Sequence, residues 1–196
     1  MKNLFDGAKD YERYLYYKEY NKNAFIFLEG DACTNVCVIK KGEISIKTSN
    51  YDTFVEINNL KDNEIFGDSL VFNNDNRYLG NVIANTDVEL YIISKDNWLK
   101  LLENKVILKN YLEIVSSKVV KIQSKVKILS QRSIREKILF YIVGESKRLN
   151  KKKIPIKSKE SLSMFLNVPR PSLSRELINL KNEGIIDFDR YSITIK

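Results

Sequence analysis

A run of apolar residues spaced alternately four and three apart, between residues 104 and 131, most restricts what this chain can fold into. This spacing keeps the apolar side chains on one face of a helix and predicts a coiled-coil seam. Neither glycine nor proline interrupts the run, so we expect one helix roughly 40 Å long. Ile107, Tyr111 and Ile114 form a second apolar face that would pack on the chain's own domain. The seam predicts a homodimer interface made by Leu108, Leu112, Val115, Val119, Ile122, Val126 and Leu129.

The residues before this helix alternate between apolar and polar in short segments that are separated by turn residues. Many short strands at such spacing predict a β-sandwich or a barrel. The tyrosine-rich residues 11–20 precede these strands and are expected to form a helix that packs on the barrel, with tyrosines that serve packing rather than ligand binding. The predicted strands cover residues 25–28, 36–39, 44–47, 54–57, 80–84 and 88–93.

Histidine is absent from the whole sequence. This residue is the commonest metal ligand and the usual proton shuttle at neutral pH. A barrel enzyme of the cupin type would need metal-ligating histidines, which disfavours that class. Cys33 and Cys37 are expected to be buried thiols rather than metal or redox residues. No paired carboxylates or activated nucleophile stand out either, so we expect no catalytic residue, no metal and no enzyme.

Positive charge is concentrated in the last third of the chain. Residues 133–196 contain 14 Lys and Arg against 7 Asp and Glu, a net of +7, whereas residues 1–132 contain 19 against 18, a net of +1. A basic end on a neutral body is typical of a protein with a nucleic-acid partner. No segment approaches the roughly 20 apolar residues of a membrane span, and residues 1–10 do not resemble a secretory signal. We therefore expect a cytoplasmic protein that does not associate with membranes.

A new helix is predicted directly after the coiled coil, because Ser133 and Glu136 fit a capping box. This helix would end in a basic, solvated connector at residues 147–153. The change from strand-like to helical spacing and the new capping signal divide the chain into three parts. We expect them at residues 1–103, 104–131 and 132–196.

Two short helices joined by a tight turn are predicted further along. Ser158 can cap the first, and Asn167 tolerates the left-handed conformation that would end it. Pro171 suits the first turn of the second helix, which Gly184 would terminate. This arrangement is a helix-turn-helix, and the alternating residues 185–195 predict a hairpin wing behind it.

Three segments resemble the Crp/Fnr superfamily of bacterial transcription regulators. Residues 28–31 and 39–44 resemble its opening strands, and residues 65–70 (Ile-Phe-Gly-Asp-Ser-Leu) resemble the start of its phosphate-binding cassette. Residues 168–177 (Val-Pro-Arg-Pro-Ser-Leu-Ser-Arg-Glu-Leu) resemble its turn and recognition helix. The resemblance implies an α+β chain with an N-terminal cyclic-nucleotide-binding-like β-roll of the jelly-roll type, a long dimerisation helix and a C-terminal winged helix-turn-helix.

The same resemblance implies a homodimer that binds an inverted-repeat operator in double-stranded DNA, with RNA polymerase as a further partner if the protein activates transcription. Ser174 and Arg175 would read bases, while Arg170 and Ser172 would hold phosphates. Pro171 stands where some members of the family place a base-reading glutamate, so one base preference of the family is expected to be altered.

The effector site departs from that of members that bind cyclic AMP. Those members have a glutamate after the cassette glycine, where this chain has Asp68. They also have serine or threonine and then alanine after the cassette arginine, where Arg77 is followed by Tyr78 and Leu79 and lies one residue early. On the long helix, Ile122 and Gln123 replace hydroxyl residues. We therefore expect that cyclic AMP does not bind and that the effector is another small molecule or none. The candidate effector residues are Gly67, Asp68, Ser69, Arg77, Tyr78, Ile122 and Gln123.

Two other chemistries of the family do not fit this sequence. Its iron–sulfur branch needs four cysteines and its haem branch generally a histidine, so we expect neither cofactor. The alternative from another class is a small-molecule sensor that acts through protein–protein contacts, with weak or vestigial DNA binding. Ser174, Arg175 and the net charge of +7 argue against that alternative.

Overall fold

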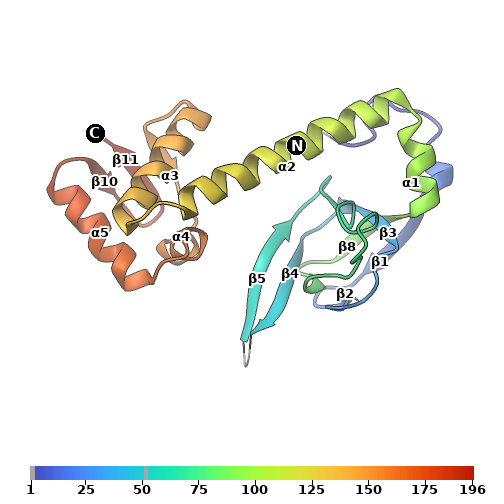
Figure 1. Cartoon of the computed structure of the whole chain (residues 1–196), viewed down its shortest axis with the longest axis horizontal. Helices are drawn as coiled ribbons and strands as arrows, with labels where there is room; N and C mark the ends of the chain where they lie inside the picture. The colour runs from blue at the N-terminus through green and yellow to red at the C-terminus, as the bar shows by residue number, and fades with distance from the viewer. Residues whose placement is uncertain (1–2, 51–52) are drawn as a thin grey trace. The chain divides into compact units, whose positions relative to one another are not determined.

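The computed structural model describes residues 3–50 and 53–196 and shows two compact units (Figure 1). They comprise Met1–Ser116 and Ser117–Lys196, so the boundary falls inside the long helix α2 (Lys105–Leu129). The functional division at residues 103/104 and 131/132 stays a prediction. No helix in the described part of the chain combines the length and apolar character that crossing a membrane requires.

Two antiparallel sheets form the β-roll of the first unit, as the alternation predicts (Figure 1). The predicted strands are present, with ends shifted by a few residues, and the short β6 and the first strand were missed. In the described residues, one sheet has the order β1 (Tyr16–Tyr20), β8 (Val88–Ser94), β3 (Asn35–Lys41), β6 (Ile65–Phe66). The other has the order β2 (Phe25–Phe27), β7 (Asn81–Ala84), β4 (Ile44–Asn50), β5 (Thr53–Leu60).

The prediction of a helix over residues 11–20 is wrong. A 3-10 turn, η1 (Glu12–Tyr14), is followed by the strand β1, which pairs with β8 from Tyr16 opposite Ile92 to Tyr20 opposite Val88. Tyrosine fits a half-buried pleated surface well, and pairing with a distant strand overrides local spacing. The structure also adds α1 (Lys95–Leu102), whose start is capped by the Ser94 side chain.

The first turns of α2 belong to the core of the first unit. Ile107 and Ile114 are buried against the roll, and Tyr111 packs edge-on against the buried Trp98 with ring centroids 5.0 Å apart. This confirms the second apolar face predicted for the helix. Asn110 is also buried, and its side-chain amide donates to the carbonyls of residues 4 and 6 at 3.0 and 2.9 Å. The helix therefore holds the N-terminal segment against the roll.

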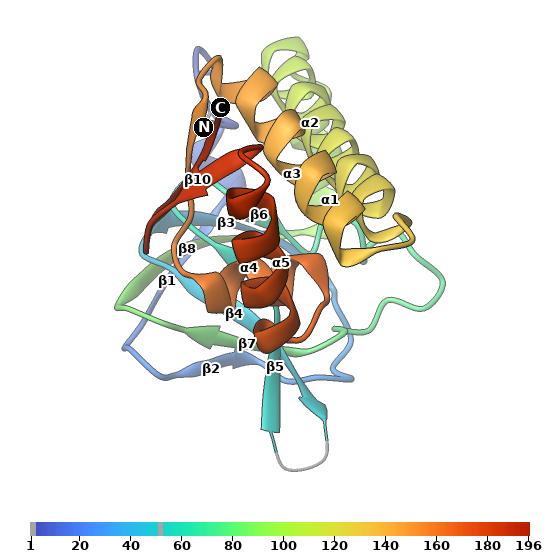
Figure 2. The ribbon, with the colours of Figure 1, turned by 90° about the vertical axis from the view of Figure 1, so that its left-hand side faces the viewer.

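The second unit combines helices with a small antiparallel sheet of order β10-β11-β9 (Figure 2). Its core contains apolar residues of all three shorter helices, such as Ile138, Leu166 and Leu177. The predicted basic connector is shorter than residues 147–153, because α3 continues to Leu149 and Lys153 begins β9. The elements are α3 (Ile134–Leu149), β9 (Lys153–Pro155), α4 (Lys159–Leu166), α5 (Arg170–Asn182), β10 (Ile186–Phe188) and β11 (Ser192–Ile195).

Local capping signals are confirmed throughout this unit. Ser133 and Glu136 form both hydrogen bonds of a capping box at the start of α3. Asn167 ends α4 in the left-handed conformation, with φ 51°, and Pro171 lies in the first turn of α5. Gly184 follows α5 with φ +73°, a conformation that glycine adopts without strain. These residues specify where the helices begin and end.

Candidate nucleic-acid interface and effector site

The helix α5 presents a polar face at its N-terminal end. Leu173, Leu177 and Leu180 are fully buried and anchor one side of the helix in the core of the second unit. The four residues predicted to contact DNA lie on the first two turns of the helix. Of the four, Arg170 and Arg175 are exposed, whereas Ser172 and Ser174 are half-buried.

The turn between α4 and α5 is held by backbone hydrogen bonds. The amide of Asn167 donates to the Met164 carbonyl at 3.2 Å, and the amide of Val168 donates to the Ser163 carbonyl at 3.0 Å. Val168 also packs against the apolar core. Together these contacts close the carbonyl end of α4 and fix the start of α5.

Arg135 links α3 to α5 through two carboxylates. Its Nη1 donates to Glu176 at 3.3 Å and to Glu183 at 2.8 Å, and its Nη2 also binds the Glu183 carboxylate. This hydrogen bond lowers the pKa of Glu183 and raises that of Arg135. Sequence reasoning missed Arg135 because its partners are 41 and 48 residues away, beyond any local pattern.

The two arginines of α5 differ from the nearby carboxylates in their ion pairing. Arg135 engages both carboxylates, Glu176 and Glu183, whereas Arg170 and Arg175 form no ion pair with any residue that the structure describes. The exposed end of α5 is therefore a cationic surface with half-buried hydroxyls beside it. Such a surface suits phosphate oxygens and the acceptor atoms of base edges.

The two units carry opposite net charge. Residues 117–196 contain 19 Lys and Arg against 7 Asp and Glu, a net of +12, whereas residues 1–116 contain 14 against 18, a net of −4. Most acidic side chains of the second unit are also engaged by nearby cations. Besides the Arg135 pairs, the ion pairs are Arg148–Glu145 at 2.6 Å, Lys153–Asp189 at 3.7 Å and Lys181–Asp187 at 2.6 Å. The second unit therefore has a positive electrostatic field around it.

The seam residues of α2 are largely uncovered within one chain. Leu112 is 55% exposed and Ile122 is 63% exposed, and Leu108, Val119 and Val126 are exposed as well. Val115 and Leu129 are half-buried. Exposing an apolar stripe of this length to water is unfavourable in free energy unless another surface covers it.

Gly67 and Asp68 of the predicted effector site lie inside the first unit. Gly67 has φ +80°, and a Cβ there would come within 2.6 Å of the Asn35 carbonyl oxygen, so only glycine fits. Asp68 is buried, and the Tyr111 hydroxyl donates to it over 3.5 Å. Burial, reinforced by Asp68, raises the pKa of Tyr111 to about 12. Asp68 therefore faces α2 rather than open solvent.

The remaining predicted effector residues point in different directions. Arg77 is exposed and donates to the Gly30 carbonyl at 2.8 Å, whereas Tyr78 is buried and stacks on Phe27 with centroids 4.6 Å apart. Ser69 is exposed, and Ile122 and Gln123 lie in the second unit. Their joint assignment to an effector site stays a prediction.

The two cysteines are buried free thiols, as expected, and burial raises the pKa of each. Among residues 3–50 and 53–196, no group of three or more cysteine or carboxylate side chains is arranged to hold a metal ion. The thiols therefore contribute to the apolar core of the roll.

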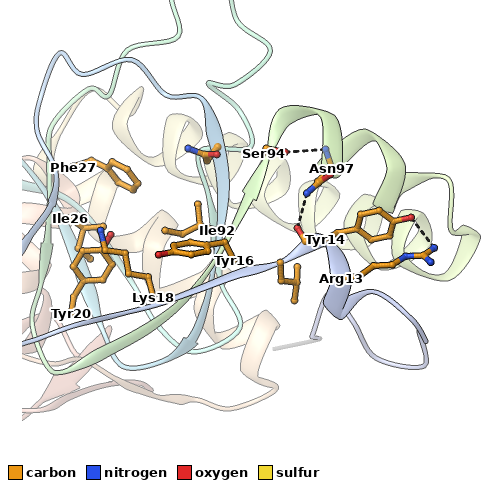
Figure 3. A pocket seen from close by; sticks show the side chains of 12 residues that line it. Arg13, Tyr14, Tyr16, Lys18, Tyr20, Ile26, Phe27, Ile92, Ser94 and Asn97 are labelled. Atoms are coloured by element: carbon orange, nitrogen blue, oxygen red, sulfur yellow. Dashed lines mark hydrogen bonds between the residues drawn. The ribbon is translucent and has the colours of Figure 1, made fainter.

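A cavity of about 480 Å³ opens beside β1, β2 and β8 in the first unit (Figure 3). Three alternate residues of β1, Tyr16, Lys18 and Tyr20, line one side of it. Sequence reasoning assigned these tyrosines to helix packing and missed the cavity. The alternation of Tyr16, Lys18 and Tyr20 with Tyr17 and Glu19 is the signal that could have indicated a strand with two different faces.

Comparison with known protein families gives a match for the first unit. Residues 17–105 match the family described as the cyclic nucleotide-binding domain. A comparison with curated proteins gives no match.

Solved structures of transcription regulators share the fold over most of the chain. CprK in complex with OCPA gives a TM-score of 0.77 at 16% identity, covering 94% of this chain and 87% of CprK. CooA from Carboxydothermus hydrogenoformans gives 0.70 at 14%, covering 100% and 92%. The catabolite activator protein of Thermus thermophilus gives 0.56 at 17%, covering 98% and 93%. The chain thus has the fold of Crp/Fnr regulators, which confirms the resemblance carried by its three sequence segments.

Proposed function

We propose that this chain is a homodimeric, DNA-binding transcription regulator of the Crp/Fnr type, modulated by an unidentified small molecule or acting without one. The observation that carries the proposal is the exposed end of α5, where Arg170 and Arg175 have no ion-pair partner among the described residues, while Glu176 of the helix and its C-cap residue Glu183 bind Arg135. CprK, CooA and the catabolite activator protein, which share this fold, are regulators rather than enzymes, which supports a regulatory role.

In this proposal the second unit is a winged helix-turn-helix whose recognition helix is α5. Such a helix enters the major groove with its N-terminal residues nearest the bases. Arg175 suits guanine because its guanidinium can donate to O6 and N7 together. Arg170 and Ser172 would bind phosphates, and the β10–β11 hairpin is the wing. The net charge of +12 on residues 117–196 supports this assignment.

The exposed seam of α2 supports a dimer in the same proposal. A second copy of the helix would cover the apolar stripe, and a two-fold dimer reads an inverted repeat whose half-sites lie about one helical turn apart. A regulator of this kind acts where the DNA is, in the cytoplasm. It would contact RNA polymerase as well if it activates transcription.

Enrichment of a randomised duplex library by the full-length protein tests the proposal. We expect recovery of an inverted repeat that binds more tightly than a scrambled duplex of the same composition, with affinity falling as salt increases. Arg13→Ala, a change at an exposed arginine of the first unit, is the control and should leave affinity unchanged. Equal binding to enriched and scrambled duplexes would overturn the proposal and favour a sensor that acts through protein contacts.

A further inference from the structure

The cavity beside β1 has the size and lining of a small-molecule site. Its volume of about 480 Å³ lies within the range of roughly 300 to 1,000 Å³ that is usual for ligand pockets. Aromatic and aliphatic side chains from β1, β2 and β8 surround it, including Tyr16, Phe27 and Ile92 (Figure 3). None of the residues assigned to the predicted effector site lines it.

The strand β1 presents two faces of different character. Tyr17 and Glu19 lie on the face away from the cavity, where the Tyr17 hydroxyl donates to the Glu19 carboxylate. On that face Lys40 binds Glu89 at 2.8 Å and lies 4.8 Å from the centre of the Tyr17 ring. The lysine on this outer face is therefore matched by a carboxylate.

Lys18 lies on the cavity face and differs from Lys40 in its ion pairing. Its ammonium lies 4.8 Å from the centre of the Tyr20 ring, and among the described residues no carboxylate pairs with it. The other cation of the lining, Arg13, donates to the Tyr14 hydroxyl at 2.9 Å, at the opposite end of the cavity (Figure 3). The aromatic end of the cavity thus contains one ammonium group without a counter-charge.

We propose that this cavity binds an organic monoanion with an apolar body, such as an aryl-substituted carboxylic acid. The carboxylate accepts a charge-assisted hydrogen bond from Lys18, and the apolar body packs between Tyr16, Phe27 and Ile92. A neutral ligand would not gain the charge-assisted hydrogen bond to this ammonium, and a cation would be repelled by it. The lining shares no residue with the predicted effector site, although Phe27 of the lining stacks on Tyr78, and the proposal goes beyond the proposed DNA-binding function.

Isothermal titration of the full-length protein with 4-phenylbutyrate, without DNA, tests this site. We expect saturable binding, about tenfold weaker binding of the neutral 4-phenylbutyramide, and a similar loss in Lys18→Gln, because either change removes the charge-assisted hydrogen bond. Lys40→Gln is the matched control, since it removes the same charge from the other face of the same sheet. The affinity of this variant for 4-phenylbutyrate should change less than about twofold.

Tyr16→Ala provides a second variant that spares the fold, because Tyr16 is 65% exposed. It should weaken 4-phenylbutyrate and its amide by the same factor, since it removes apolar contact and leaves the charge. Equal affinity of Lys18→Gln and Lys40→Gln for the carboxylate would overturn the proposal, as would no saturation by 4-phenylbutyrate, 1-naphthoate or octanoate at 10 mM. Since no DNA is present, these outcomes are independent of whether the protein regulates transcription.

Discussion

Arg175 and Arg170 both lie on α5, and we expect them to bind DNA in different ways. Arg175→Ala should cost roughly 1 to 3 kcal/mol on the cognate duplex and relax one base position, because a bidentate contact with guanine is lost. Arg170→Ala should weaken all duplexes and lower the salt slope by about one, because a phosphate contact is lost. Binding titrations on cognate and scrambled duplexes at several salt concentrations measure both. An equal loss on both duplexes for Arg175→Ala would make Arg175 a phosphate contact instead.

Glu183 should make the stability of the second unit depend on pH. The hydrogen bond from Arg135 keeps its pKa in the folded state below the ordinary value of about 4.3, which holds in the unfolded chain. The pair therefore stabilises the fold fully above that ordinary pKa, and its contribution is lost as the pH falls through the folded-state pKa. We expect Glu183→Gln to lower the urea midpoint at pH 7 and to have little effect near pH 3, as followed by circular dichroism.

The control for that measurement is Glu183→Gln made in a protein that already carries Arg135→Gln. Without the guanidinium, Glu183→Gln should have the same effect on the urea midpoint at both pH values. If the pH dependence persisted in the Arg135→Gln background, another group would be responsible for it.

At the scale of elements, α2 determines whether the molecule is a dimer. Val119 and Ile122 are 45% and 63% exposed, so replacing both by glutamate should leave the fold of the chain intact. Charges in the seam should nevertheless exclude a second helix and give a monomer by sedimentation at micromolar concentration. The control is Lys121→Glu, which adds a charge outside the seam and should leave the dimer in place. A native protein that sediments as a monomer would contradict the interface.

The elements that sequence reasoning predicts are those with local signals. Ser133 with Glu136 at the start of α3 and Asn167 at the end of α4 each act within a few residues, and the heptad spacing of α2 is local as well. By contrast, β1 and β9 exist because they pair with strands far along the chain, β8 and β11. Their own residues fit more than one conformation, so partners that spacing cannot identify decide the outcome.

The same distinction applies to the sites. The residues expected to contact DNA follow one another on α5, and their positions could be predicted once the helix was recognised. The cavity beside β1 is assembled from η1, β1, β2, β3, β8 and α1, between residues 13 and 97. A lining drawn from so many elements leaves no contiguous motif. The cavity can be recognised only in the folded structure, where Lys18 lies in its lining without a carboxylate partner among the described residues.

For the whole molecule, residues 17–105 match the cyclic nucleotide-binding domain family, yet we expect the protein not to bind cyclic AMP at physiological concentration. The exposed Arg77 donates to the Gly30 carbonyl, and the buried Tyr78 stands where members that bind cyclic AMP have serine or threonine. Calorimetric titration of cyclic AMP into the protein measures this. Tight binding that disappears in Arg77→Ala would show that the cassette is functional despite its departures.

Because the two units have opposite net charges, positive charge is not spread evenly over the chain. The net charge of +8 predicts mutual repulsion, but a net of −4 on residues 1–116 and +12 on residues 117–196 lets unlike units of neighbouring molecules attract. Screening is weak at about 0.01 M salt, where the Debye length is about 30 Å, and stronger at 0.15 M, where it is about 8 Å. Self-association measured by light scattering should therefore decrease as salt is added, so the protein salts in.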